Sequence, residues 1–316
     1  MRVILDKKLA QLTEKLRATT RMTPKALIAT IYADMLVPHG GTVWLGSIVK
    51  LAKLFDVVEY LSRTSALRLV YDGWLHPTRI GKLSFYSMTE EHITRLKEHY
   101  PRVYGPPVRI WSGTWYLLLT AAAGLNRKQL LEVRQNFKFH GVGQLATNIY
   151  ISAAETLDAI DVILLELDLR DKVEVMRAES VLPKDTGLLR KLVQSAWDIE
   201  NIASLYDDFL SRFRPIRLAL EKVGEIDPQT AFILRAILIN EYRIIALQDP
   251  RLPQELLPEP WSGTQAFNLC KSLYQSVLEP SEEFLRISVK TADGPIGDAG
   301  DLLYSRFNGL SRERQI

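Results

Sequence analysis

The segment from residue 24 to residue 87 most constrains the fold of this chain. Apolar residues recur there at helical spacing in three short runs, which begin at Pro24, Val43 and Glu59 and end by Tyr71. Gly73–Leu75 then begins an extended stretch, and the turn residues of Arg79–Lys82 separate it from a second alternating stretch. Short helices this close together are typical of a helix-turn-helix, and the following strands predict a β-hairpin wing.

The flanking residues complete the first predicted domain. Residues 1–20 show an amphipathic helical pattern, and Thr89 precedes Glu90 and Glu91, as expected for a capped helix start. Pro101, Gly105, Pro106 and Pro107 then end the unit. We therefore predict a winged helix-turn-helix DNA-binding domain over residues 1–105.

The rest of the chain predicts an α+β multidomain protein. Strand and helix patterns alternate over 109–182, which indicates a central ferredoxin-like α/β domain that we expect to dimerise. Residues 183–316 predict a C-terminal, mostly helical domain for effector response, with Pro215 dividing two helices and Asp227–Pro228 starting another. The strand and helix ranges expected in the central domain are 114–120, 126–140, 146–152, 155–167 and 172–178.

Charge is distributed unevenly along the chain. Residues 1–109 hold 17 Lys and Arg against 9 Asp and Glu, a net charge of +8, whereas the remaining residues hold 23 against 28. A basic N-terminal third favours contact with a polyanion.

The run from Glu59 to Tyr71 is the predicted recognition helix. A helical wheel places Val58, Leu61, Ser65 and Leu69 on a packed face, and a second face combines the residue types that contact DNA bases. On that second face lie Tyr60, Arg63, Thr64, Leu67 and Tyr71. We expect Arg63 to contact a base and Arg68, on the flank, to contact phosphate. A solvated helix face is the alternative for this helix alone, but Arg79 and Lys82 beside a glycine turn favour DNA binding.

Several motifs resemble the PaaX family of phenylacetate-pathway repressors, from about residue 22 to residue 310. They are Tyr32–Asp34, Gly40–Ser47, Arg63–Thr64, Arg68–Leu69, Gly73–Leu75, Arg79–Lys82, Ser84–Ser87, Trp111–Trp115 and Asp249–Pro258. The resemblance implies a dimeric repressor of phenylacetic acid catabolism that leaves its operator when phenylacetyl-CoA binds. The predicted contacts to double-stranded operator DNA are Trp44, Ser47, Tyr60, Arg63, Thr64, Arg68, Arg79, Lys82, Ser84 and Tyr86.

An acyl-CoA effector would need cations for its phosphates and an apolar pocket for its aromatic acyl group. The C-terminal region offers both kinds of side chain, and the candidates are Arg235, Tyr242, Arg243, Arg251 and Trp261, with Phe232 nearby in sequence. Ordinary helix-surface cations and core aromatics are the alternative for these residues. A DNA-binding, dimerising scaffold without a small-molecule effector is the alternative function.

An enzyme is a weaker hypothesis. The Gly141–Ala146 stretch follows a helix and precedes a strand, the reverse of a dinucleotide-binding loop. The strand Trp115–Thr120 lacks the carboxylate that a ferredoxin-like nuclease would use for its metal. The lone Cys270 has no cysteine partner, and the five histidines lack metal-site spacing. We expect no catalytic residue, metal or cofactor.

The longest apolar run, Trp115–Leu125, is interrupted by Thr120 and Gly124 and falls short of the ~18–20 residues that cross a bilayer. The first residues also lack the apolar core of a signal peptide. We expect a bacterial cytoplasmic protein that joins the nucleoid when bound to its operator.

Overall fold

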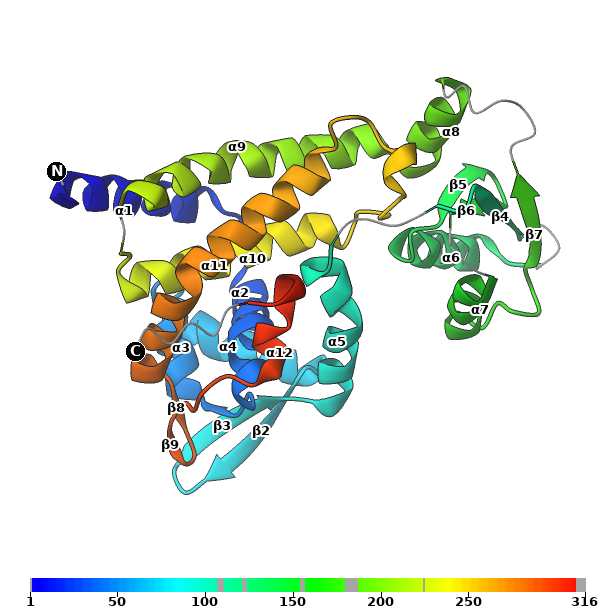
Figure 1. Cartoon of the computed structure of the whole chain (residues 1–316). Coiled ribbons are helices and arrows are strands. Elements are labelled where there is room, and N and C mark those ends of the chain that lie inside the picture. The colour runs from blue at the N-terminus through cyan, green and yellow to red at the C-terminus, as the bar shows by residue number, and fades with distance from the viewer. Residues whose placement is uncertain are drawn as a thin grey trace. The chain divides into compact units, whose positions relative to one another are not determined.

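The computed structural model describes residues 2–106, 111–120, 124–153, 157–179, 187–223 and 225–310, with side chains from residue 8. These residues form two compact units. The first unit holds residues 1–106, 209–244 and 266–316, and the second holds residues 107–208 and 245–265. Figure 1 shows the elements of both.

The N-terminal part of the first unit contains the predicted short helices. Helix α1 (Arg2–Thr19) precedes α2 (Pro24–Thr30), where Thr23 Oγ1 accepts a hydrogen bond from Ala26 N at 3.2 Å. The chain continues through a π-helical turn, Ile31–Leu36, and a 3₁₀ turn, Val37–His39. After strand β1 (Val43–Trp44) come α3 (Leu45–Lys53) and α4 (Glu59–Tyr71). The three helices predicted from residue 24 are therefore present, but the second begins at Leu45, because Val43 and Trp44 pair with β3 as a short strand.

The predicted hairpin is also confirmed. Strands β2 (Leu75–Ile80) and β3 (Leu83–Met88) pair antiparallel, and β1 adds to β3 to give the order β1-β3-β2. Gly81 at the tip has a φ of 61°, in the left-handed region that favours glycine. Helix α5 (Glu90–Tyr104) follows, and the predicted cap is present because Thr89 Oγ1 accepts a hydrogen bond from His92 N.

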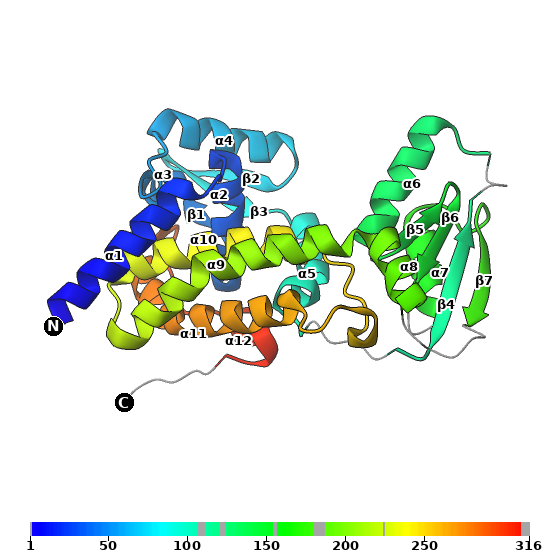
Figure 2. The same ribbon diagram turned by 90° about the horizontal axis from the view of Figure 1, so that it is seen from above.

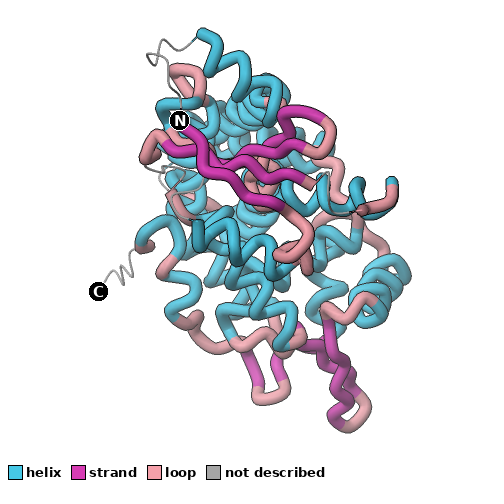
Figure 3. The backbone as a smooth tube through the Cα atoms, turned by 90° about the vertical axis from the view of Figure 1, so that its right-hand side faces the viewer, coloured by secondary structure: helices cyan, strands magenta, loops and turns pink. Residues whose placement is uncertain are grey.

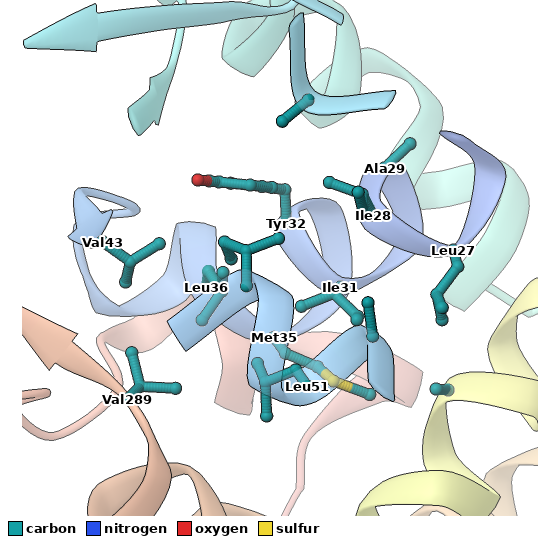
Figure 4. Close-up of a cluster of buried hydrophobic side chains, with 14 of the residues drawn as sticks. Leu27, Ile28, Ala29, Ile31, Tyr32, Met35, Leu36, Val43, Leu51 and Val289 are labelled. Atoms are coloured by element: carbon teal, nitrogen blue, oxygen red, sulfur yellow. The ribbon is translucent and has the colours of Figure 1, made fainter. Parts of the chain in front are cut away.

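Two C-terminal helices, α10 (Pro228–Ala246) and α11 (Ser262–Ser288), contribute to the hydrophobic core of these N-terminal elements. With α9 (Ile199–Val223), they supply residues 209–223, 228–244 and 266–288 of the first unit. Phe232 and Val289 join Tyr32, Met35 and Leu51 in one buried cluster, and Figure 4 shows Val289 with the N-terminal side chains. Full burial of such side chains stabilises a fold by roughly 1.5–3 kcal/mol each.

Short elements end the described chain. Strands β8 (Lys290–Thr291) and β9 (Gly294–Pro295) form a small hairpin, which Figures 1 and 3 show near the β2–β3 hairpin. Helix α12 (Asp301–Tyr304) and a 3₁₀ turn, Arg306–Asn308, follow.

Two predictions about helices are wrong. Pro215 lies inside the continuous α9 and does not divide two helices, because Phe213 and Ile216 beside it are buried and hold the helix against the core. On α4, Val58 and Leu61 are 59% and 44% exposed, whereas the buried side is lined by Ser62, Ser65, Ala66 and Leu69. Val58 is the N-cap residue, which precedes the first helical turn.

The second unit contains a β-α-β-β-α-β arrangement. Strand β4 (Thr114–Leu119), helix α6 (Arg127–Phe139), strands β5 (Gly143–Ala146) and β6 (Ile149–Ser152), helix α7 (Leu157–Glu166) and strand β7 (Glu174–Glu179) follow in chain order. The antiparallel sheet has the order β5-β6-β4-β7, so the expected ferredoxin-like α+β fold is present. Figure 3 shows the sheet, and Figure 2 labels α6, α7 and α8 around it.

One strand of this sheet was not predicted. Gly143 begins β5, so a hairpin of two strands, with Asn148 at a φ of 61° in its turn, stands where the single strand 146–152 was expected. Helix α8 (Gly187–Trp197) packs on β5, where a Cβ on Gly143 would lie 2.5 Å from the Trp197 ring. The absence of a side chain at Gly143 therefore makes room for Trp197.

The compact units cut across the predicted division into three domains. Residues 209–244 and 266–316, expected in a separate C-terminal domain, group with residues 1–106 because they share a core cluster. The domain limits 1–105, 109–182 and 183–316 remain a prediction.

Candidate nucleic-acid interface

Helix α4 offers one face to its unit and one to the surroundings. Small side chains line the inner face, including Ser62, Ser65 and Ala66, and this face packs against α2. Because each helical residue advances by about 100°, the residues at Tyr60, Thr64, Leu67 and Tyr71 form a stripe opposite the buried side. The exposed fractions of Tyr60, Leu67 and Tyr71 are 75%, 45% and 80%. We call these four residues the outer stripe.

Arginines flank the outer stripe. Arg63 lies on one side, where its Nη2 is 2.8 Å from Glu59 Oε1, and Arg68 lies exposed on the other side. Within the stripe, the Thr64 hydroxyl donates to the Tyr60 carbonyl oxygen at 2.8 Å. Glu59 therefore positions Arg63 along the surface of α4. This ion pair contributes little to stability, because both side chains are more than half exposed.

The β2–β3 hairpin carries further basic residues. Arg79 and Lys82 are exposed on either side of its Gly81 turn, and Arg79 Nε donates to the Gly81 carbonyl oxygen at 3.3 Å. Ser84 pairs with Arg79 in the strand register and is half-buried. Tyr86 packs against the core cluster, and its carbonyl oxygen accepts a hydrogen bond from the Tyr32 hydroxyl at 3.1 Å.

Trp44 and Ser47 differ from the other predicted DNA contacts. Trp44 is half-buried with its ring over Gly46, and Lys50 Nζ lies 5.9 Å from the ring centroid. Ser47 is only 1% exposed, and its Oγ accepts a hydrogen bond from Lys290 N at 2.9 Å. The structure therefore does not support Ser47 as a surface contact, because its side chain holds α3 to the β8–β9 hairpin.

A buried ionic cluster in the first unit was not predicted from the sequence. Asp34, in the π-helical turn, is 1% exposed and accepts hydrogen bonds from Arg235 Nε at 2.7 Å and from Arg306 Nη1 at 2.8 Å. The hydroxyl groups of Tyr104 and Tyr274 also donate to Asp34 Oδ1, at 2.6 and 3.1 Å. One carboxylate thus joins α5, α10, α11 and the 3₁₀ turn 306–308 to the segment that precedes α3.

The cluster extends to a second buried carboxylate. Arg235 Nη1 donates to Glu282 Oε1 at 2.5 Å, and His39 Nε2 lies 2.8 Å from Glu282 Oε2. Burial alone would raise the pKa of Asp34, but the charges of Arg235 and Arg306 outweigh it and hold the pKa below its ordinary value. Burial would likewise raise the pKa of Glu282, but Arg235 and His39 lower it to about 2. Both carboxylates are therefore charged at neutral pH.

The predicted effector residues have different local surroundings. Arg235 is 0% exposed within the ionic cluster, and Tyr242 is buried with its ring centroid 5.6 Å from that of Phe209. Arg243, on the same helix, contacts Asn240 Oδ1 at 3.5 Å. Arg251 and Trp261 belong to the second unit. Arg235 is thus a structural ion-pair residue, and its burial argues against a direct phosphate contact.

Arg251 and Trp261, the two candidates in the second unit, make contacts with nearby residues. The backbone N–H of Arg251 donates to Asp249 Oδ1 at 2.6 Å, and Trp261 is buried with its ring centroid 5.9 Å from that of Tyr206.

In the described ranges, no group of three His, Cys, Asp or Glu side chains has an arrangement suited to a metal ion. No helix among the described residues is long and apolar enough to span a membrane.

The sequence contains a weak indication of the ionic cluster. Asp34 and Arg235 each interrupt an apolar helical run, and a charge within such a run indicates a buried partner. The sequence does not identify that partner, since Asp34 and Arg306 are 272 positions apart.

Comparison with known proteins places these features in a family. Models described as PaaX-like protein, PaaX protein central Cas2-like domain and PaaX-like protein C-terminal domain match residues 23–92, 109–189 and 197–287. The transcriptional repressor PaaX of Escherichia coli K12 is 33% identical over 291 residues, which cover 92% of each protein. The uncharacterized protein Rv0674 from Mycobacterium tuberculosis shares the fold, with a TM-score of 0.56, 18% identity, and coverage of 82% of this chain and 97% of that one. The extent of the three family models, together with this identity to the repressor, shows that the chain belongs to the PaaX family.

Proposed function

We propose that this protein is a transcriptional repressor that binds double-stranded operator DNA through a winged helix-turn-helix. Helices α2, α3 and α4 supply the helix-turn-helix, and the β2–β3 hairpin supplies the wing. The observation that carries the proposal is the exposed face of α4, with Arg63 and Arg68 on its flanks and Arg79 and Lys82 on the adjoining hairpin. The repressor named among its relatives supports the same function.

The proposed DNA contacts divide into those to bases and those to phosphates. Arg63 and the outer stripe of α4 face base edges in the major groove, where an arginine pairs with guanine acceptors. Arg68 and the hairpin residues Arg79 and Lys82 contact phosphates, which supply affinity without sequence preference. Ser84, Tyr86 and Trp44 support this surface, since each is half-buried.

The proposed repressor is a homodimer with its two-fold axis through the central domains. Two recognition helices would then lie about 34–36 Å apart, one turn of B-DNA, and bind a palindromic operator. A ligand that rotates the heads by a small angle would prevent both helices from entering the groove together.

The proposed effector is phenylacetyl-CoA, as the family resemblance implies, with expression of phenylacetate catabolic genes as the regulated outcome. The ionic cluster supplies a route for coupling, because Asp34 ties the segment before α3 to α10 and α11. A displacement of these helices would move the residues that support α4. Such couplings are typically worth ~1–3 kcal/mol, and the ligand would bind DNA-bound protein more weakly by the same factor.

Binding of fluorescent operator fragments tests the DNA-binding function. We expect Arg63→Ala to weaken binding to a cognate fragment by about 1–3 kcal/mol and to relax base preference at one position. Arg177→Ala is a matched control, since Arg177 is an exposed, ion-paired arginine in the second unit. Equal binding by Arg63→Ala and wild type would refute the assigned role of α4.

Two alternatives predict different results. A DNA-binding scaffold without an effector would show no saturable binding of phenylacetyl-CoA. A ferredoxin-like nuclease would cleave DNA with Mg²⁺, whereas the repressor leaves the fragment intact. In support of the repressor, the described part of β4 offers no carboxylate.

A further inference from the structure

The outer stripe of α4 is more apolar than phosphate or polar base contacts require. Tyr60 and Tyr71 are at least three-quarters exposed, and Leu67 between them is 45% exposed. The Thr64 hydroxyl hydrogen is already used within the helix, since it bonds to the Tyr60 carbonyl oxygen. Large apolar side chains gathered on one face indicate an interaction surface.

The charges around the stripe favour nucleic acid over a second copy of the chain. Arg63 and Arg68 lie on its opposite flanks, and Arg79 and Lys82 are exposed on the neighbouring hairpin. A two-fold contact between copies would place these cations close to their own counterparts, at a cost in free energy. A polyanion instead complements all four charges.

Base-edge chemistry then narrows what the stripe recognises. Leu67 has no polar atom, so it gains no hydrogen bond from any base. In the major groove the only apolar group among the four ordinary bases is the 5-methyl group of thymine. We propose that Leu67, supported by Tyr60, packs on thymine methyl groups and selects thymine within each operator half-site. This inference rests on the proposed DNA-binding function.

Removal of single methyl groups from the DNA tests this inference. The full-length protein first selects a duplex from a library of random-sequence fragments. Each thymine of the enriched duplex is then replaced in turn by deoxyuridine, which keeps the base pair and removes only the methyl group. Fluorescence anisotropy gives the dissociation constant of each duplex. We expect about fourfold weaker binding at one or more positions, equivalent to ~0.8 kcal/mol for one buried methyl-sized group.

The Leu67→Ala variant connects the methyl group to the side chain. We expect it to bind the thymine duplex more weakly and to lose the deoxyuridine effect at the position that Leu67 contacts. Because Leu67 is exposed and alanine favours helix, the fold should persist, and circular dichroism checks this. The control is Leu131→Ala on α6, where another exposed leucine lies in the second unit, and its deoxyuridine profile should match wild type.

Four results would overturn the inference, and one of them would also overturn the proposed function. Selection of a duplex that is insensitive to every deoxyuridine, or an unchanged profile in Leu67→Ala, leaves DNA binding intact and refutes methyl recognition. Loss of self-association in Leu67→Ala by sedimentation velocity, with no change in the profile, assigns the stripe to a second copy. Failure to enrich any duplex refutes the DNA-binding function itself.

Discussion

Replacing Asp34 by alanine should strongly destabilise the first unit. The Asp34 carboxylate accepts hydrogen bonds from Arg235, Arg306, Tyr104 and Tyr274, and the side chains of Asp34, Arg235 and Arg306 are at most 2% exposed. In Asp34→Ala the two guanidinium groups would remain buried, with Glu282 as the carboxylate partner of Arg235. Removing one partner of a buried ion pair typically costs about 3–5 kcal/mol, because a charge is left uncompensated.

The assay is urea-induced unfolding followed by circular dichroism, with Asp34→Asn as a variant that keeps the shape and removes the charge. The matched control is Glu91→Gln, which removes an exposed partner of Arg95 on α5 and should change the free energy of unfolding by less than about 1 kcal/mol. If the two units unfold in separate transitions, the one affected by Asp34→Ala is compared. A change for Asp34→Ala no larger than that for Glu91→Gln would refute the structural role of the cluster.

Three further predictions concern pH, packing and charge. Because the pKa of folded Glu282 is lowered to about 2 from an ordinary value of 4.5, its contribution to stability is present above pH 4.5 and is lost as the pH falls toward 2. Unfolding measured between pH 6 and 2 should therefore show a shallower loss in Glu282→Gln than in wild type, and parallel curves would contradict this. Gly143→Ala should destabilise the second unit by roughly 1–3 kcal/mol, because the added Cβ would clash with the Trp197 ring. The control Gly187→Ala should not destabilise it, because the space around Gly187 is open. Thermal unfolding compares the two variants. Arg79→Ala and Lys82→Ala should each lower the slope of log affinity against log salt by about 1 if they contact phosphate, and an unchanged slope in anisotropy titrations would remove them from the interface.

Sequence patterns correctly predicted the helix starts and the hairpin turn that depend on neighbouring residues alone. Thr23–Pro24, Thr89 and Asp227–Pro228 mark helix starts that the structure confirms, and Arg79–Lys82 marks a hairpin turn. Each of these signals depends on backbone geometry within a few residues.

The errors arise where packing between distant segments decides the outcome. Pro215 should interrupt a helix by its missing N–H, yet core contacts at Phe213 and Ile216 keep α9 continuous. The predicted packed face of α4 wrongly included Val58, which lies before the first helical turn, and Leu61, which is exposed. Arg235 lies buried against Asp34 and Glu282, contacts that no local pattern could identify, and its role in effector binding stays a prediction.

The proposed repressor is tested most directly by fluorescence anisotropy of the purified protein with DNA from upstream of phenylacetate catabolic genes, titrated with phenylacetyl-CoA. We expect tight binding that the thioester reverses and that free phenylacetate at the same concentration leaves unchanged. Binding that persists when the thioester is saturating would contradict the proposed effector, and the absence of DNA binding would contradict the proposed repressor.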